Sequence, residues 1–148
     1  MKIVVDANIV FSGILNTHGK IGDLLLNSFP FLNFIAPEFL RTEIYKHYDK
    51  LQKISKLTLE QILESEYYIY KTITFVSEEQ ISDESWLFAY ELVSDIDAKD
   101  IVYIAFAKQF NCNLWTGDKK LINKLAQKNY QNIWTTDDLF YFLKKMKF

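Results

Sequence analysis

The chain has 148 residues, which is the size of one ordinary domain with a single hydrophobic core. Its balance of 49% hydrophobic and 24% charged residues excludes a wholly disordered protein. With a net charge of −2, the protein as a whole has no positive charge that would indicate a nucleic-acid partner. In this total, however, the carboxylates of an acidic metal site would offset the positive charge of a local basic surface. The single Cys112 excludes an internal disulfide and suits a reducing compartment.

The chain begins with a strand that ends at an acid. Ile3, Val4 and Val5 are consecutive β-branched residues, which is typical of a strand buried on both faces and therefore of the centre of a parallel sheet. Asp6 follows at the carboxyl end, the edge where open α/β sheets bind ligands. No signal peptide and no apolar stretch of bilayer length are evident, so we expect a cytoplasmic protein that does not contact a membrane.

Strands and helices are expected to alternate along the rest of the chain. Further strands are predicted at residues 33–36, 72–76, 113–116 and 133–135. Helices are predicted at 8–15, 21–28, 37–55, 58–70, 83–93, 100–108 and 119–128, with a last helix after residue 135. This alternation indicates βαβ units, so we predict a single α/β domain over residues 1–148 with three α/β/α layers and a mainly parallel sheet of four or five strands.

Several residues are predicted to fix the helix boundaries. Asn8 is the expected N-cap of the first helix, and Pro37 suits the first position of the long helix that runs to residue 55. Thr58 and Gln61 have the spacing of a capping box. In the last helix, Leu139, Phe140 and Leu143 are expected to face inward, after a cap at Thr135 or Thr136.

Four carboxylates occupy positions that a core or a plain solvated surface does not explain well, namely Asp6, Glu43, Asp100 and Asp118. Asp6 and Asp118 each follow a strand, and Asp100 stands in the first turn of a helix, one turn after Asp97. Each has a structural explanation on its own, as a helix cap, a helix-dipole partner or, for Glu43, an ion pair with Lys46 or His47.

Together these acids favour a metal site. Two strand-end acids and one helix-start acid share one edge of a parallel sheet, and clustered carboxylates repel one another unless they are protonated or bridged by cations. Oxygen ligands favour Mg²⁺ or Mn²⁺, whereas Zn²⁺ prefers His and Cys, of which the chain has only three.

Four blocks of sequence carry a family resemblance: residues 4–12 (VVDANIVFS), Glu43 in a helix after Pro37, residues 97–100 (DAKD) and residues 114–119 (LWTGDK). In this order they resemble the PIN-domain ribonucleases, above all the small bacterial VapC-like toxins of toxin–antitoxin modules. The resemblance runs over nearly the whole chain and is weakest at residues 59–92. It implies a PIN-like fold and a cofactor of Mg²⁺ or Mn²⁺.

The resemblance also assigns roles to individual residues. It implies that Asp6, Glu43, Asp100 and Asp118 are the catalytic metal ligands, with Asp97 as a supplementary acid. It implies that Asn8, Ser12 and Thr116 support the acids or the substrate phosphate. Basic residues beside the acids are candidate RNA contacts, with a solvated helix face as the alternative for each: Arg41, Lys46, Lys50, Lys119, Lys120 and Lys124.

The implied activity is endonucleolytic hydrolysis of RNA phosphodiester bonds, which leaves a 5′-phosphate and a 3′-hydroxyl. A cognate antitoxin is the implied partner, and the aromatic content of 16% together with the family suggests a homodimer. One alternative is a PIN-like domain that binds RNA or protein without catalysis. A magnesium-dependent phosphatase of the haloacid dehalogenase type is disfavoured because Asn8 stands where that family needs a second acid.

Overall fold

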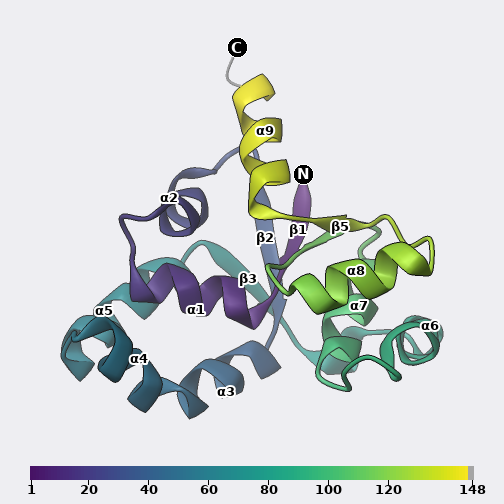
Figure 1. Cartoon of the computed structure of the whole chain (residues 1–148), viewed down its shortest axis with the longest axis horizontal. Coiled ribbons are helices and arrows are strands. Elements are labelled where there is room, and N and C mark those ends of the chain that lie inside the picture. Colours follow the sequence, from purple (N-terminus) through teal and green to yellow (C-terminus); the bar gives the residue numbers. More distant parts are fainter. Residues whose placement is uncertain (147–148) are drawn as a thin grey trace.

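Five parallel strands form the centre of the molecule in the order β3-β2-β1-β4-β5 (Figure 1). The computed structural model describes residues 1–146. The strands are β1 (Lys2–Val5), β2 (Asn33–Pro37), β3 (Ile73–Val76), β4 (Asn113–Trp115) and β5 (Ile133–Trp134). The first strand is central, as its run of β-branched residues predicts: Val4 pairs with Ile35 of β2 on one side and with Leu114 of β4 on the other.

Helices cover both faces of the sheet, which confirms the predicted three-layer α/β/α fold. One layer contains α1 (Ala7–Leu15), α2 (Lys20–Asn27), α3 (Phe39–Lys46), α4 (Tyr48–Ser55) and α5 (Leu59–Tyr70), and the other contains α6 (Asp83–Val93), α7 (Asp100–Gln109) and α8 (Lys119–Gln127) (Figure 1). A short 3₁₀ helix, η1 (Glu78–Gln80), follows β3, and α9 (Thr136–Met146) ends the described chain. Within residues 1–146 no helix combines the length and the apolar character needed to cross a membrane.

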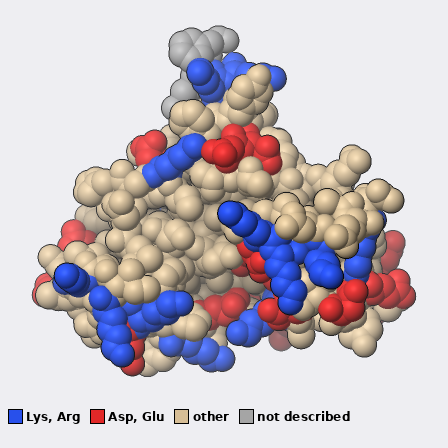
Figure 2. Space-filling model, in the orientation of Figure 1, with Lys and Arg blue, Asp and Glu red and all other residues tan. Residues whose placement is uncertain are grey.

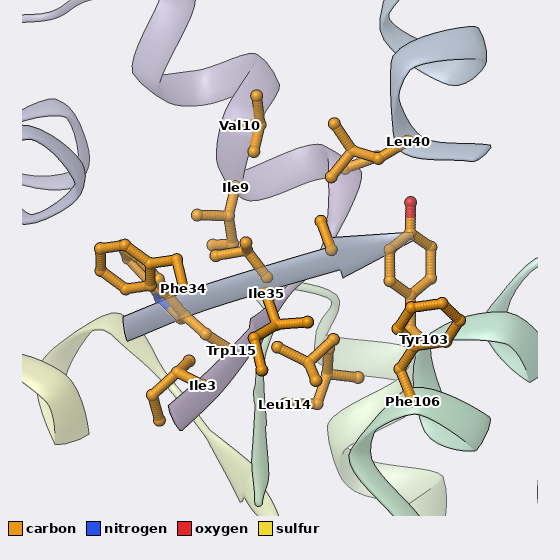
Figure 3. Close-up of a cluster of buried hydrophobic side chains, with 14 of the residues drawn as sticks. Ile3, Ile9, Val10, Phe34, Ile35, Leu40, Tyr103, Phe106, Leu114 and Trp115 are labelled. Carbon is orange, nitrogen blue, oxygen red and sulfur yellow. The ribbon is translucent and has the colours of Figure 1, made fainter. Parts of the chain in front are cut away.

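The core lies between β1 and the helices on its two faces (Figure 3). Ile3, Val4 and Val5 are fully buried, and the rings of Phe34 on β2 and Trp115 on β4, the two strands that flank β1, pack 5.7 Å apart. A strand buried in this way is held rigidly, so the residue at its carboxyl end is held rigidly too. Cys112 is half-buried against this core, as expected for a small packing residue.

The predicted long helix over residues 37–55 is wrong in two respects. Pro37 is the last residue of β2, and the helix begins at Phe39. The helix then breaks at His47, whose backbone angles of φ −111° and ψ 16° lie outside the helical region. The bend lets α3 and α4 both pack against α1, a tertiary contact that the helical periodicity of the sequence does not reveal.

Two further predictions about helix residues are wrong. Asn8 is exposed inside the first turn of α1, and Asp6 takes the N-cap position. Phe140 is 49% exposed, whereas Leu139 and Leu143 are buried as predicted. The capping box is confirmed, because the Gln61 amide donates to Thr58 Oγ1 and the Thr58 amide donates to Gln61 Oε1.

Candidate metal centre

A cleft of about 250 Å³ opens at the carboxyl edge of the central strands, and its wall is rich in carboxylates. Five acids line it: Asp6, Glu43, Asp97, Asp100 and Asp118. They come from four separate segments, which are the ends of β1 and β4, the middle of α3, and the start of α7. Because β1 and β4 are adjacent and parallel, the residues that follow them emerge at the same edge of the sheet.

Asp6 is buried at the base of the cleft, with 7% of its surface exposed. Its Oδ2 accepts a hydrogen bond of 2.7 Å from the Thr116 hydroxyl. The pKa of Asp6 is raised to about 6, mainly because burial disfavours the charged form and in part because of the nearby charge of Glu43. The hydrogen bond from Thr116 opposes this shift without cancelling it.

Thr116 also connects Asp6 to Asp118. The backbone amide of Asp118 donates to Thr116 Oγ1 over 3.1 Å. Asp118 is the N-cap of α8, and its Oδ1 accepts from the Leu121 amide at 3.1 Å. One buried hydroxyl therefore fixes the relative positions of two acids that follow neighbouring strands.

Asp100 is a buried acid whose carboxylate is incompletely hydrogen-bonded. It opens α7, is 7% exposed, and its Oδ2 is buried without a hydrogen-bond partner among residues 1–146. Burial, together with the charges of Asp6, Asp97, Asp118 and Glu43, raises the pKa of Asp100 to about 7. An unpaired buried carboxylate oxygen surrounded by other acids is costly in the absence of a cation.

Glu43 is held by a residue of the opposite helical layer. The Tyr103 hydroxyl donates to Glu43 Oε1 at 2.5 Å, although the two residues lie 60 positions apart in the chain. Tyr103 is 2% exposed, and burial together with the adjacent Glu43 carboxylate raises the pKa of its hydroxyl above the usual range. The phenol therefore remains protonated and acts as a hydrogen-bond donor to Glu43.

Comparison with known proteins identifies the family of this chain. The family model described as "PIN domain" matches residues 4–143, nearly the whole chain. The chain belongs to the PIN domain family. No curated protein sequence matches it well enough to be named as a relative.

Three solved structures share the fold of this PIN domain. PAE2754 from Pyrobaculum aerophilum is 13% identical with a TM-score of 0.70, and the alignment covers 98% of this chain and 90% of that one. VapBC2 from Rickettsia felis, bound to a DNA fragment from its promoter, is 16% identical with a TM-score of 0.63 over 91% and 98% of the two chains. VapBC-1 from nontypeable Haemophilus influenzae is 14% identical with a TM-score of 0.61 over 93% and 99%.

The donor chemistry of the PIN-domain cleft fits a hard divalent cation. Five carboxylates line the cleft against a single imidazole, that of His47, and the buried Asp100 Oδ2 lacks a hydrogen-bond partner among residues 1–146. Within residues 1–146, no three His, Cys, Asp or Glu side chains are already gathered around one point as a ready ligand set. The cleft thus offers suitable donors, whose side chains have to turn toward an ion to coordinate it.

The structure separates the predicted site residues into two groups. Asn8 and Lys50 line the cleft together with the five acids, and Thr116 lies buried directly beneath Asp6. The remaining candidates do not line the cleft: Ser12, Arg41, Lys46, Lys119, Lys120 and Lys124. Arg41 is engaged elsewhere, with its guanidinium 3.8 Å from the centre of the Phe75 ring and its Nε 3.0 Å from Glu38.

Six residues that the sequence did not identify as site residues also line the cleft, namely Ala7, Phe11, Ile44, His47, Lys99 and Tyr103. Tyr103 stands three positions after Asp100 on α7, so helical spacing alone places both side chains on one face. Lys99 directly precedes Asp100 and is a cation among the acids. Phe11 and His47 meet edge to face at 6.3 Å, a contact that depends on the break between α3 and α4.

Proposed function

We propose that this PIN domain is a metal-dependent endoribonuclease that hydrolyses RNA phosphodiester bonds. The observation that supports it best is the cleft in which Asp6, Glu43, Asp100 and Asp118 meet, since two of these acids are buried and have raised pKa values. Buried acids with raised pKa values destabilise a fold, so their presence together in a cleft indicates a functional site. The membership of the chain in the PIN domain family supports nuclease activity as that function.

Mg²⁺ or Mn²⁺ bound in the cleft would supply Lewis acidity, which polarises the scissile phosphate and activates a water molecule. Asp6, Asp100 and Asp118 are the residues that hold the ion, and Glu43 is the fourth candidate ligand. Thr116 fixes the orientation of Asp6 and Asp118 from below. Among residues 1–146, His47 is the only His, Cys, Ser or Thr residue that lines the cleft, so the described part of the chain offers no Ser–His or Cys–His nucleophile there.

A polyanion requires positive charge beside this acidic site. Lys50 and Lys99 line the cleft itself. Lys and Arg side chains also gather over α8 and over α3 and α4, with acidic side chains between them (Figure 2). Lys119 and Lys120, exposed at the start of α8 directly after Asp118, are well placed to contact RNA phosphates on one side, and Lys46 of α3 is a candidate on the other.

We further propose that the enzyme is the toxin of a toxin–antitoxin pair. Two of the solved structures with this fold are described as VapBC assemblies, one of them on DNA from its own promoter. This likeness supports a cognate antitoxin as the partner of the present chain, and the same class of protein suggests a homodimer. Co-expression with the product of an adjacent small gene, followed by co-purification, tests the partnership.

The catalytic proposal is tested with purified protein and two RNAs, one single-stranded and one structured, in Mg²⁺, Mn²⁺ or EDTA. We expect cutting that requires the metal and is lost in both Asp6→Asn and Asp100→Asn. Asp137→Asn is the matched control, because Asp137 is an exposed acid of α9 that pairs with Lys20. RNA binding without cutting by the wild type would instead identify a non-catalytic PIN domain, and hydrolysis of small phosphomonoesters would identify a phosphatase.

A further inference from the structure

We infer that Tyr103 is a positioning residue that sets the orientation of the Glu43 carboxylate for metal binding. The inference rests on the proposed metal-dependent function and adds to it a residue outside the acidic set. Tyr103 touches neither substrate nor ion in this account and acts only through Glu43.

The contact between the two side chains is short and partly buried. The Tyr103 hydroxyl donates to Glu43 Oε1 at 2.5 Å. Because this hydrogen bond engages Oε1, Oε2 is the Glu43 oxygen left to face an ion. A hydrogen bond to a charged acceptor is stronger than one between neutral groups, so it restricts the rotation of the carboxylate.

The position of Tyr103 couples two helical layers that the chain does not connect locally. Glu43 belongs to α3, in the layer that contains α1, whereas Tyr103 belongs to α7 on the opposite face of the sheet. Asp100 lies on the same α7 helix, three residues earlier. The hydrogen bond therefore fixes the distance between the helix that carries Glu43 and the helix that carries Asp100, across the mouth of the cleft.

The Tyr103 ring anchors the hydroxyl. The side chain packs next to Phe106 in the core, and its hydroxyl points away from Phe106, toward the helix that carries Leu40, which is α3 (Figure 3). Tyr103→Phe keeps this ring in place and removes only the donor. The substitution thus separates positioning of Glu43 from packing of the core.

Tyr70 provides a matched control within the same molecule. Its hydroxyl is also buried, but it has no hydrogen-bond partner. Tyr70→Phe removes the same atom from a site that does not touch the acids. A general effect of deleting a buried phenol oxygen would appear in both variants, whereas an effect on Glu43 would appear only in Tyr103→Phe.

Groups that orient metal ligands through a hydrogen bond typically contribute roughly 10–100-fold in metal affinity. The test is therefore the affinity of the 148-residue protein for Mn²⁺, measured by calorimetry without RNA. The expected result is a loss of roughly 10–100-fold in Tyr103→Phe, no change in Tyr70→Phe, and thermal melting showing both variants folded. In RNA cleavage, Tyr103→Phe is expected to need more Mn²⁺ for half-maximal rate and to approach the wild-type rate when Mn²⁺ saturates.

A double-mutant comparison makes the test specific to Glu43. In the Glu43→Ala background, Tyr103→Phe is expected to have no further effect on Mn²⁺ affinity, because the hydroxyl no longer has a carboxylate to orient. An undiminished effect in that background overturns the inference, as does wild-type Mn²⁺ affinity in Tyr103→Phe. Failure of the wild-type protein to bind Mn²⁺ at all would overturn the proposed metal-dependent function and this inference with it.

Discussion

Thr116 and Asp6 are joined by a buried hydrogen bond of 2.7 Å, although 110 positions separate them in the chain. The parallel pairing of β1 with β4 brings their carboxyl ends together, so the residue after each strand meets the other at the same edge. Since Thr116 also accepts from the Asp118 amide, its hydroxyl forms part of the base of the candidate metal centre. The Thr116 side chain thus links the topology of the sheet to the arrangement of the acids in the cleft.

Replacing Thr116 by valine should destabilise the protein, because valine keeps the volume but removes the hydroxyl. Asp6 Oδ2 loses a buried donor, which costs about 1–3 kcal/mol, while the Asp118 amide, which is only partly buried, can turn to water for its lost acceptor. We expect a loss of roughly 1–3 kcal/mol in urea unfolding and weaker Mn²⁺ binding. Thr74→Val, at an exposed position of β3, is the control and should leave both quantities unchanged. Equal behaviour of the two variants would contradict the role of this hydroxyl.

The metal-free protein should become less stable as the pH rises through the neutral range. The pKa of Asp100 is raised from 3.8 to about 7 and that of Asp6 to about 6, so the folded state binds protons more tightly than the unfolded chain. This contribution to stability is fully present below about pH 4 and is lost as the pH rises past 7. At about 1.4 kcal/mol per pKa unit, we expect a loss of roughly 2–4 kcal/mol between pH 5 and pH 8.

Urea unfolding in EDTA at several pH values measures this loss. In Asp100→Asn the stability should vary much less with pH, because the amide does not titrate, and the variant should be more stable than the wild type at pH 8. Asp137→Asn should retain the full pH dependence, since it removes an exposed acid that does not line the cleft. A free energy of unfolding that rises between pH 5 and pH 8 would show that folding does not raise the pKa values of these acids.

Divalent metal should reverse this effect of pH. A ligand that binds only the folded state stabilises it by about 2.7 kcal/mol at a concentration 100 times its Kd. We therefore expect Mn²⁺ to raise the Tm of the wild type at pH 8 and to raise it less at pH 5, where protons compete for Asp100 and Asp6. Differential scanning calorimetry checks this. Asp6→Asn should show little response, and a comparable response in that variant would place the ion elsewhere.

The sequence contained enough information to predict the sheet and the positions of the strand-end acids. Three buried β-branched residues before Asp6 marked the central strand, and parallel pairing then determined which ends converge. These features depend on local residue type and on general rules of α/β topology, so they are visible without coordinates.

What the sequence could not predict depends on contacts between distant segments. The helix break at His47 is not marked by a Gly or Pro in the sequence. It is explained by the packing of both α3 and α4 against α1. The exposure of Phe140 depends on which side of α9 meets the rest of the protein. Tyr103 lies on the same helical face as Asp100, but its partner Glu43 is 60 residues away. Secondary-structure patterns do not encode such pairings.

If RNA crosses the start of α8, neutralising Lys119 and Lys120 together should weaken its binding and reduce the dependence of binding on salt. Both side chains are exposed directly after Asp118. Each lysine that contacts a phosphate contributes roughly 0.7 to the slope of log K against log salt for a single strand, because its contact releases a counterion. We expect Lys119→Gln with Lys120→Gln to lower this slope by up to that amount per residue, measured by fluorescence anisotropy with Ca²⁺ or EDTA to prevent cutting.

The control pair, Lys144→Gln with Lys145→Gln, removes equal charge from the far end of α9 (Figure 1). An equal change in both pairs would attribute the effect to net charge, and would place the RNA path away from α8.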